Sequence, residues 1–464
     1  MRTLDRLRGA YARSPRWVQS TGGRLLALVP PSLQYGRAFR DTRAAIARSE
    51  RDAAFVEEQA TASLRALLLC AQGTPYYAET LAGVDAGSVT LASLGGLPIV
   101  TRDLVRRHGD EMLAEPKHRL DQRMTSGTSE ASLAVYLDRD RSVREWAFQT
   151  HVWEKGGYRL GDRRAVIRGH MFRNAQATYW SWEPANRELR LSPLRMVPAV
   201  MDEYLGLMTR YRIAFVHGYP SAITLLARHA SRAGWRPPST LRGVLPISEP
   251  VLPDQRRAIR EGFGPIPVVP FYGLTEKVAF AGEVQGEPDV YDFEPLYGLA
   301  EIVGPDGRPL APGQRGRLVG TGFVSTGMPL IRYFTGDRAT VVQTPSPSNC
   351  WRLRVKDIAS DSQPFYLVTA EGGLTPRKGL TYNRVARDYQ IVQREPGRAT
   401  LRVVPEAGID RRDVEAFARD VAADSGGLLT FDVEVVSEIP AGARGKRRYI
   451  EQHLDLADYG LRDE

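Results

Sequence analysis

A run of hydroxyl side chains around one glycine is the first feature of this sequence that could do chemistry. It reads Thr125-Ser126-Gly127-Thr128-Ser129. Hydroxyl donors and exposed backbone N–H groups are what a polyphosphate needs from a protein. Similar clusters are common in plain surface loops, so this run needs support from other motifs.

A second motif, Phe271-Tyr272-Gly273-Leu274-Thr275-Glu276, directly follows a predicted buried strand. A glycine after an aromatic residue lets a flat ring approach the backbone. The carboxylate of Glu276 is a suitable ligand for Mg²⁺, which takes one or two carboxylates together with phosphate oxygens. A strand-end turn with a surface glutamate would have the same pattern.

Two further motifs add a carboxylate and a lysine. Asp337, in Thr335-Gly336-Asp337, lies at a tight turn where it could accept two hydrogen bonds from a ribose diol. Lys446 lies on a glycine-flanked loop and could stabilise negative charge between a phosphate and a carboxylate. Only six of the 63 basic residues are lysines, which favours a lysine-specific task for it. An ordinary aspartate turn and a solvated basic run are the alternatives.

The elements that must position these motifs alternate between strand and helix from 160 to 275. We predict strands at 164–168, 213–217, 243–247 and 266–271, with helices at 222–233, capped by Ser221, and at 253–262. This alternation predicts an α/β sheet with ligands at the carboxyl ends of its strands.

The flanking segments have other patterns. Residues 1–50 show little periodic structure, and 52–70 has the spacing of a buried helix. Short strands between Gly/Pro turns predict a β-rich subdomain over 295–345. The last ~100 residues predict a small α+β domain. Its expected elements are a hairpin at 389–405, a helix at 410–423 and a strand at 429–436.

Composition indicates an ordinary globular protein. The chain has 464 residues, 42% of them hydrophobic, which predicts two or three domains. No apolar run approaches the ~20 residues of a membrane span, and we expect a cytoplasmic location. The net charge of +9 is scattered along the chain, so we expect no nucleic-acid partner. The two cysteines, Cys70 and Cys350, fit no metal spacing or disulfide framework.

Taken together in their order, the motifs resemble the adenylate-forming superfamily of acyl-coenzyme A synthetases, luciferases and peptide-synthetase adenylation domains. The sequence is most similar to the phenylacetate–coenzyme A ligase-like branch, which includes proteins associated with capsular polysaccharide synthesis. Four stretches carry the branch resemblance: LPIVTR at 97–102, TSGTSE at 125–130, HGYPS at 217–221 and MPLIRY at 328–333.

The resemblance implies an α/β fold with a large N-terminal domain, 1–358, and a small mobile α+β domain, 359–464. It implies ATP and Mg²⁺ as cofactors. Tyr272, with Gly273, would lie against adenine, Asp337 would bind ribose, and Lys446 would catalyse adenylation. Thr275 and Glu276 would serve phosphate and Mg²⁺. The hydroxyl loop would grip the triphosphate through Thr125, Ser126, Gly127, Thr128 and Ser129, and Ser248 and Glu249 lie on a loop between the acyl and nucleotide pockets.

The implied reaction activates a small carboxylic acid as an acyl-adenylate. Coenzyme A is the default acceptor of the acyl group, and an amine or a sugar hydroxyl is the alternative. We expect Tyr136, His170, His217 and Tyr219 near the acyl pocket, and their mixed polar and aromatic character favours a small aromatic or polar acid. No feature of the sequence indicates an oligomeric state.

The sequence departs from the family at two places. Glu130 puts a carboxylate in the phosphate loop, where glycine is usual. Ser360-Asp361-Ser362 replaces the Gly-Arg pair expected at the hinge, so an arginine is missing there unless Arg352, Arg354 or Lys356 substitutes. These changes leave open a degenerate member that binds a nucleotide or acyl group without turnover. A basic interaction protein is the third hypothesis.

Overall fold

The computed structural model describes residues 35–125, 133–168, 179–193, 196, 198–360, 366–372, 374–376, 385–424, 429–440 and 449–459. The chain falls into two compact units. The first contains Gly161–Val268 and Gln363–Glu464, and the second contains Val29–Leu160 and Val269–Ser362. The expected division into 1–358 and 359–464 stays a prediction, because each unit combines segments that are distant in sequence.

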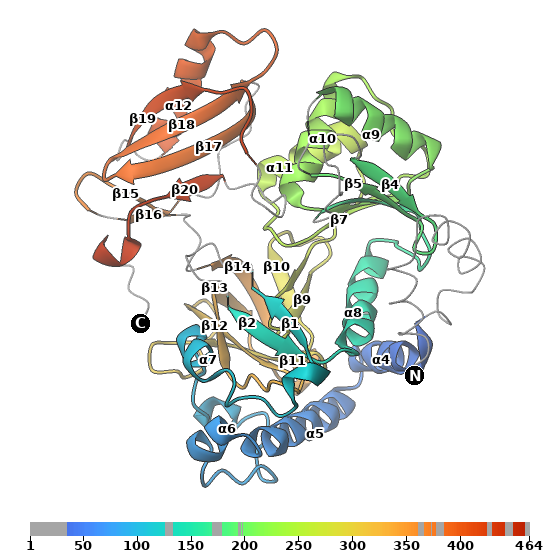
Figure 1. Ribbon diagram of the computed structural model, residues 1–464, viewed down its shortest axis with the longest axis vertical. Coiled ribbons are helices and arrows are strands. Elements are labelled where there is room, and N and C mark those ends of the chain that lie inside the picture. Colours follow the sequence, from blue (N-terminus) through green and yellow to red (C-terminus); the bar gives the residue numbers. More distant parts are fainter. Residues whose placement is uncertain are drawn as a thin grey trace. The chain divides into compact units, whose positions relative to one another are not determined.

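A seven-stranded antiparallel sheet forms the core of the second unit, in the order β11-β12-β13-β14-β10-β9-β8. The β-rich pattern predicted over 295–345 is confirmed, because three of these strands lie within it. The strands are β8 (Phe271–Gly273), β9 (Phe280–Glu283), β10 (Val290–Phe293), β11 (Gly298–Val303), β12 (Arg315–Gly322), β13 (Tyr333–Gln343) and β14 (Arg354–Ser360) (Figure 1).

Helices and a two-stranded ribbon complete the second unit. The helix predicted at 52–70 is confirmed as α5 (Ala53–Gln72), which buries Leu64, Leu67 and Leu68. Helix α4 (Gly36–Ser49) was missed, because its buried apolar residues are only Phe39 and Ile46 among many arginines. The other elements are β1 (Asp121–Met124), β2 (Ala134–Leu137), α6 (Pro75–Thr80), α7 (Arg102–His108), α8 (Arg141–Lys155), η1 (Leu94–Gly96), η2 (Lys117–Arg119) and η3 (Pro347–Asn349).

A five-stranded sheet in the order β4-β5-β3-β6-β7 lies in the first unit. Its strands are parallel except β4. A buried apolar cluster joins three helices to this sheet (Figure 1). The elements are β3 (Arg164–Ile167), β4 (Trp180–Glu183), β5 (Glu188–Leu191), β6 (Phe215–Gly218), β7 (Gly243–Pro246), α9 (Pro198–Arg210), α10 (Pro220–Arg232) and α11 (Pro253–Phe263). The α/β fold class is confirmed.

The strand predicted at 266–271 is wrong. Only a bridge between Val244 and Val268 forms there, and β8 begins at Phe271 in the other sheet. Pro267 and Pro270 explain the error, because proline has no N–H to donate to a strand ladder. The predicted cap Ser221 is also wrong. Helix α10 begins at Pro220 after Tyr219, so Ser221 lies inside its first turn.

The carboxyl-terminal segment is α+β, as predicted. A four-stranded sheet in the order β19-β18-β17-β20 packs on α12. The predicted hairpin, helix and strand are confirmed. The elements are β17 (Ala386–Glu395), β18 (Arg398–Pro405), α12 (Arg411–Asp424), β19 (Thr430–Val435), β20 (Ile450–Gln452), the β15 (Tyr366–Val368) and β16 (Leu374–Pro376) pair and η4 (Leu456–Tyr459).

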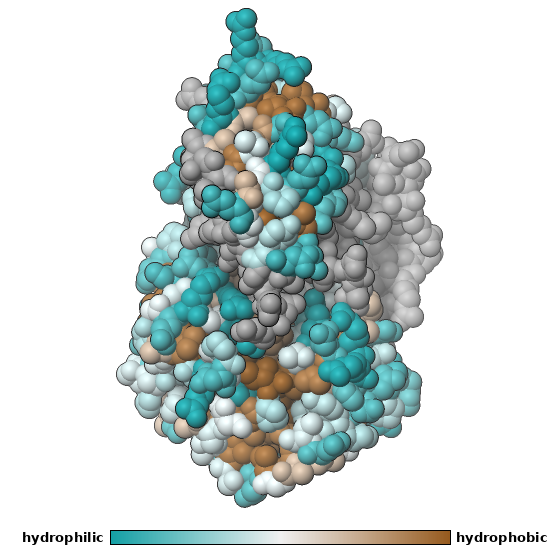
Figure 2. Space-filling model, turned by 90° about the vertical axis from the view of Figure 1, so that its left-hand side faces the viewer, coloured by the Kyte–Doolittle hydropathy of each residue, from teal (hydrophilic) through white to brown (hydrophobic). Residues whose placement is uncertain are grey.

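Charged side chains line the exposed strands of this segment, whose surface in the upper part of Figure 2 is mainly hydrophilic. The guanidinium of Arg398 pairs with Asp432, and that of Arg402 pairs with Glu434, across neighbouring strands. None of the described helices is long and apolar enough to cross a membrane.

Candidate active site

The hydroxyl-rich loop begins where β1 and β2 form an antiparallel ribbon. Thr125 is buried, its N–H donates to Leu133 O (2.9 Å), and its Oγ1 accepts from Leu133 N (3.0 Å). These bonds close the base of the loop. The Thr125 hydroxyl keeps its own proton, which a phosphate oxygen could accept. Ser126, Gly127, Thr128, Ser129 and Glu130 lie outside the described residues.

Two tyrosine–carboxylate pairs join the 271–276 motif to the 332–337 motif. The Tyr272 hydroxyl donates to Asp337 Oδ2 at 2.5 Å, and the Tyr333 hydroxyl donates to Glu276 Oε1 at 3.1 Å. Each motif thus supplies one tyrosine and one carboxylate to the other. The pairs fix both acidic side chains that the sequence singled out, and they were not foreseen.

Asp337 and Tyr272 form the first of these pairs at the end of β8. Asp337 N also donates to Thr335 Oγ1 (3.1 Å), and Gly336 between them has a φ of +79°. The tight turn expected at Asp337 is wrong, because these three residues lie within strand β13. The Tyr272 ring meets Phe293 edge to face at 5.7 Å. Burial, and then the charge of Asp337, raise the pKa of Tyr272, so its hydroxyl stays a proton donor.

Glu276 is buried, with 5% of its surface exposed. Burial raises the pKa of its carboxyl, while nearby Arg102 and the bond from Tyr333 act in the opposite direction. Arg102 begins α7, directly after the LPIVT stretch. The next residue along the chain, Lys277, forms an ion pair with Glu145 (2.7 Å), so its ammonium group is already engaged. Arg102 and Tyr333 are therefore functional candidates that the sequence reasoning did not single out.

A Mg²⁺ ion fits one carboxylate of this kind. The described residues contain no group of three or more His, Cys, Asp or Glu side chains that could hold a metal. A metal at Glu276 would have to take its other ligands from phosphate and water, which is how Mg²⁺ binds with nucleotides. Gly273 is exposed and Thr275 partly buried beside it, so both are open to a ligand.

Arg332, in the same motif, has a structural role. It is 2% exposed, and all five of its N–H donors are used. Two bonds go to Glu301 (2.9 and 3.0 Å), and three go to the carbonyls of Gly95, Leu97 and Gly307 (2.9, 2.6 and 2.7 Å). This side chain therefore ties the LPIVT stretch to the motif that carries Asp337, and it has no donor left for a phosphate.

The possible substitutes for the missing hinge arginine, Arg352, Arg354 and Lys356, lie on β14 or directly before it. Arg352 pairs with Glu294 (2.7 Å), and Arg354 makes two bonds to Asp292 (2.7 and 2.9 Å). Both guanidiniums are thus engaged by carboxylates of the same unit. Lys356 is exposed on β14, and Ser360 Oγ donates to Gly336 O (3.4 Å).

In the other unit, candidate residues lie at the carboxyl end of β6. His217 is buried and its Nδ1 lies 2.7 Å from Leu245 O, so Nδ1 carries a proton that it donates to this carbonyl. Tyr219 is buried at the start of α10. Glu249 accepts hydrogen bonds from Ser221 N (3.0 Å) and Ser221 Oγ (3.1 Å), and Ser248 adopts a left-handed conformation (φ +68°). Glu249 therefore acts as the cap of α10.

Of the three remaining predicted residues, Tyr136 is the one that the structure describes. Tyr136 is on β2 in the other unit, where Lys117 Nζ lies 5.3 Å from its ring centroid. His170 and Lys446 lie outside the described residues. The chain resumes after Lys446 at Tyr449, whose hydroxyl accepts from Gln255 Nε2 of α11 (2.9 Å).

Comparison with known proteins connects this fold to the adenylate-forming ligases. The structure is similar to that of 2-hydroxyisobutyryl-CoA ligase in the postadenylation state in complex with 2-HIB-AMP, with a TM-score of 0.66, 17% identity and coverage of 89% of this chain and 92% of that one. The acyl acid amido synthetase AtGH3.15 matches with a TM-score of 0.56 and 13% identity over 90% of this chain and 95% of that one. The chain has the fold of these enzymes.

Two relatives also match in sequence, and no family model matches. Protein CapK of Staphylococcus aureus is 21% identical over 392 residues, which cover 82% of this chain and 85% of CapK. Phenylacetate-coenzyme A ligase of Thermus thermophilus is 25% identical over 230 residues, 48% of this chain and 50% of that protein. The expected resemblance to the phenylacetate–coenzyme A ligase-like branch is confirmed.

Proposed function

We propose that this chain is an AMP-forming carboxylate ligase, which uses ATP to convert a small carboxylic acid to an acyl-adenylate. The observation that carries the proposal is the reciprocal pairing of Tyr272 with Asp337 and of Tyr333 with Glu276. These bonds hold two carboxylates in place, Asp337 on β13 and Glu276 in the connection between β8 and β9. Both carboxylates belong to motifs that the ligase resemblance assigns to ATP.

In the proposed reaction, a carboxylate oxygen of the acid attacks the α-phosphorus of ATP. The bond from that phosphorus to the bridging oxygen breaks, and pyrophosphate leaves with the electron pair. Asp337 orients the nucleotide through the ribose, and the Thr125 loop donates hydrogen bonds to the phosphates. Lys446 stabilises the negative charge that grows at the α-phosphate. A Mg²⁺ ion at Glu276 would neutralise phosphate charge when bound.

The acyl group then passes to a second nucleophile. We propose coenzyme A as the acceptor, because both the phenylacetate-coenzyme A and the 2-hydroxyisobutyryl-CoA ligases that match carry this acceptor in their names. An amine is the alternative that the amido synthetase suggests. A sugar hydroxyl as the acceptor is supported by the sequence reasoning alone. The same is true of the expected cytoplasmic location.

The test is pyrophosphate release from ATP and Mg²⁺ across a panel of aryl, hydroxy and amino acids, with hydroxylamine to trap the acyl-adenylate. We expect acid-dependent release that falls by orders of magnitude in Lys446→Ala while ATP still binds. Arg444→Ala, which removes a neighbouring charge from the same segment, should keep most of the activity. Silence across the panel with ATP bound would favour the degenerate binding protein.

A further inference from the structure

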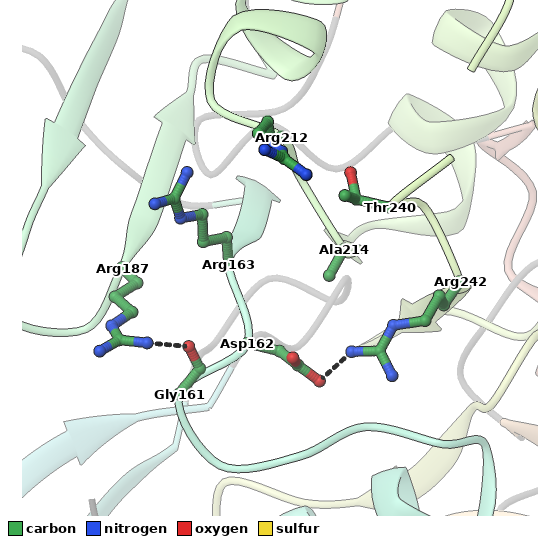
Figure 3. Close-up of a pocket in the computed structure, with 8 residues that line it drawn as sticks. All are labelled: Gly161, Asp162, Arg163, Arg187, Arg212, Ala214, Thr240 and Arg242. Atoms are coloured by element: carbon green, nitrogen blue, oxygen red, sulfur yellow. Dashed lines mark hydrogen bonds and ion pairs between the residues drawn. The ribbon is translucent and has the colours of Figure 1, made fainter. Parts of the chain in front are cut away.

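A pocket of about 530 Å³ lies at the amino ends of the parallel strands in the first unit. Figure 3 shows that its side chains come from four separate connections. Arg163 precedes β3, Arg187 ends the turn between β4 and β5, Arg212 follows α9, and Arg242 precedes β7. Four segments far apart in the sequence thus each bring one guanidinium to the same cavity.

The charges of this pocket are not balanced within its lining. Among the described residues of the lining, Asp162 is the one carboxylate, and it pairs with Arg242 (2.7 Å). Arg163 donates to Tyr211 O (3.0 Å), which is a neutral carbonyl. The described residues of the lining therefore carry four positive charges and one negative charge. Across the whole chain the ratio is close to even, with 63 basic and 54 acidic residues.

Two of the arginines occupy costly backbone positions. Arg187 and Arg212 have φ values of +54° and +49°, a left-handed conformation that glycine or asparagine adopts with less strain. Arginine at both positions places its side chain at the rim of the pocket (Figure 3).

This pocket lies away from the candidate residues of the same unit. In a parallel sheet, the amino ends of all strands lie at one end of the sheet, and the carboxyl ends lie at the opposite end. Arg163 and Arg242 precede their strands, whereas His217 lies near the end of β6 and Ser248 follows β7. A ligand in the pocket would therefore occupy a site separate from His217 and Ser248 of the same unit.

We propose that this pocket binds a small anion that carries two or more linked phosphate groups. A diphosphate or triphosphate has about the charge needed to balance the lining, and the planar fork of arginine matches two phosphate oxygens at once. Ala214 is the apolar side chain of the lining, and Thr240 Oγ1 already donates to Ile213 O (3.0 Å). Among the described residues of the lining there is thus no aromatic ring on which a base could stack.

The experiment is calorimetric titration of the full chain with inorganic tripolyphosphate at fixed ionic strength. The test variant is Arg187→Asn/Arg212→Asn, because asparagine tolerates the left-handed conformation of both positions. We expect this variant to bind one equivalent of tripolyphosphate fewer than the wild type. If the nucleotide site also binds tripolyphosphate, the number of bound equivalents falls from two in the wild type to one in the variant. If the proposed function is wrong and that site is absent, it falls from one to zero.

The matched control is Arg37→Asn/Arg411→Asn, which removes the same charge from two exposed helix positions. It should bind as the wild type does. A second variant, Arg163→Ala, should weaken the same binding event at least tenfold and guards against a folding defect in the double variant. Equal stoichiometry in the wild type and both test variants, or an equal loss in the control, would overturn the proposal. The proposal would also be overturned if sulfate competed for the pocket as well as tripolyphosphate does at matched ionic strength.

Discussion

The hydroxyl of Tyr272 donates a 2.5 Å hydrogen bond to Asp337, so the proposed adenine and ribose contacts are parts of one linked structure. A carboxylate has about four lone-pair sites, and one bond from a tyrosine leaves capacity for a ribose diol. The bond holds Asp337 in place before any nucleotide arrives. In the proposed site Tyr272 would thus have two tasks, one for its ring and one for its hydroxyl.

Tyr272→Phe separates these tasks, because it keeps the ring and removes the hydroxyl. Without the hydroxyl, Asp337 is no longer held in the position that meets the ribose diol, so we expect ATP to bind more weakly, by roughly tenfold. The measurement is ATP affinity by titration. Binding of 2′,3′-dideoxy-ATP should be unaffected, since it has no diol to meet Asp337. Equal weakening for both nucleotides would instead indicate a disturbed adenine contact.

The pH dependence of activity reports on Glu276. A metal site needs the ionised carboxylate, and burial raises the pKa of this group. Activity should therefore fall on acidification at a higher pH than an ordinary glutamate would give. In Tyr333→Phe the carboxylate loses the bond that favours its charged form, so the acid limb should move to still higher pH, and more Mg²⁺ should be needed.

Tyr297→Phe is the control for that prediction. Tyr297 is fully buried, and its hydroxyl has no hydrogen-bond partner among the described residues. Removal of this hydroxyl should leave the acid limb and the Mg²⁺ requirement unchanged. If both tyrosine variants moved the limb equally, Glu276 would not be the titrating group.

Local sequence patterns predicted the elements of this fold better than the contacts of its site. The periodicity of Leu64 and Leu67 gave α5, and Pro396-Gly397 gave the turn of the β17–β18 hairpin. The apolar run at 266–271 predicted a strand that does not form, because Pro267 and Pro270 have no N–H to donate to a strand ladder. The tyrosine–carboxylate pairs could not be predicted, because they join residues 57 and 65 positions apart through tertiary packing.

Arg332 shows why a motif residue needs a structure before it receives a role. Its five bonds predict that Arg332→Lys destabilises the fold, because lysine has three donors and cannot reproduce the two-bond pairing with Glu301. We expect the free energy of unfolding to fall by about 3 kcal/mol or more, as when a buried ion pair is broken. Denaturant titration is the measurement. Arg308→Lys, on an exposed turn, should change it little, and a tolerated Arg332→Lys would contradict the structural role.

Gly218 is the last residue of β6, and its lack of a side chain lets two strands approach. A Cβ there would lie 2.2 Å from Ile167 O, the partner residue on β3. Gly218→Ala should therefore lower the free energy of unfolding by about 1–3 kcal/mol, since overpacking forces the backbone to shift. It should also weaken binding of the acid, because Tyr219 follows directly.

Gly206→Ala, in the same unit, should raise the free energy of unfolding. Gly206 lies within α9, and a Cβ there would meet nothing within 4 Å. Alanine is the better helix former by up to about 1 kcal/mol, so this variant should be more stable than the wild type. If β3 and β6 pair as closely as described, thermal unfolding should show a lower melting temperature for Gly218→Ala and a higher one for Gly206→Ala. A Gly218→Ala protein as stable as Gly206→Ala would mean that the two strands do not approach this closely.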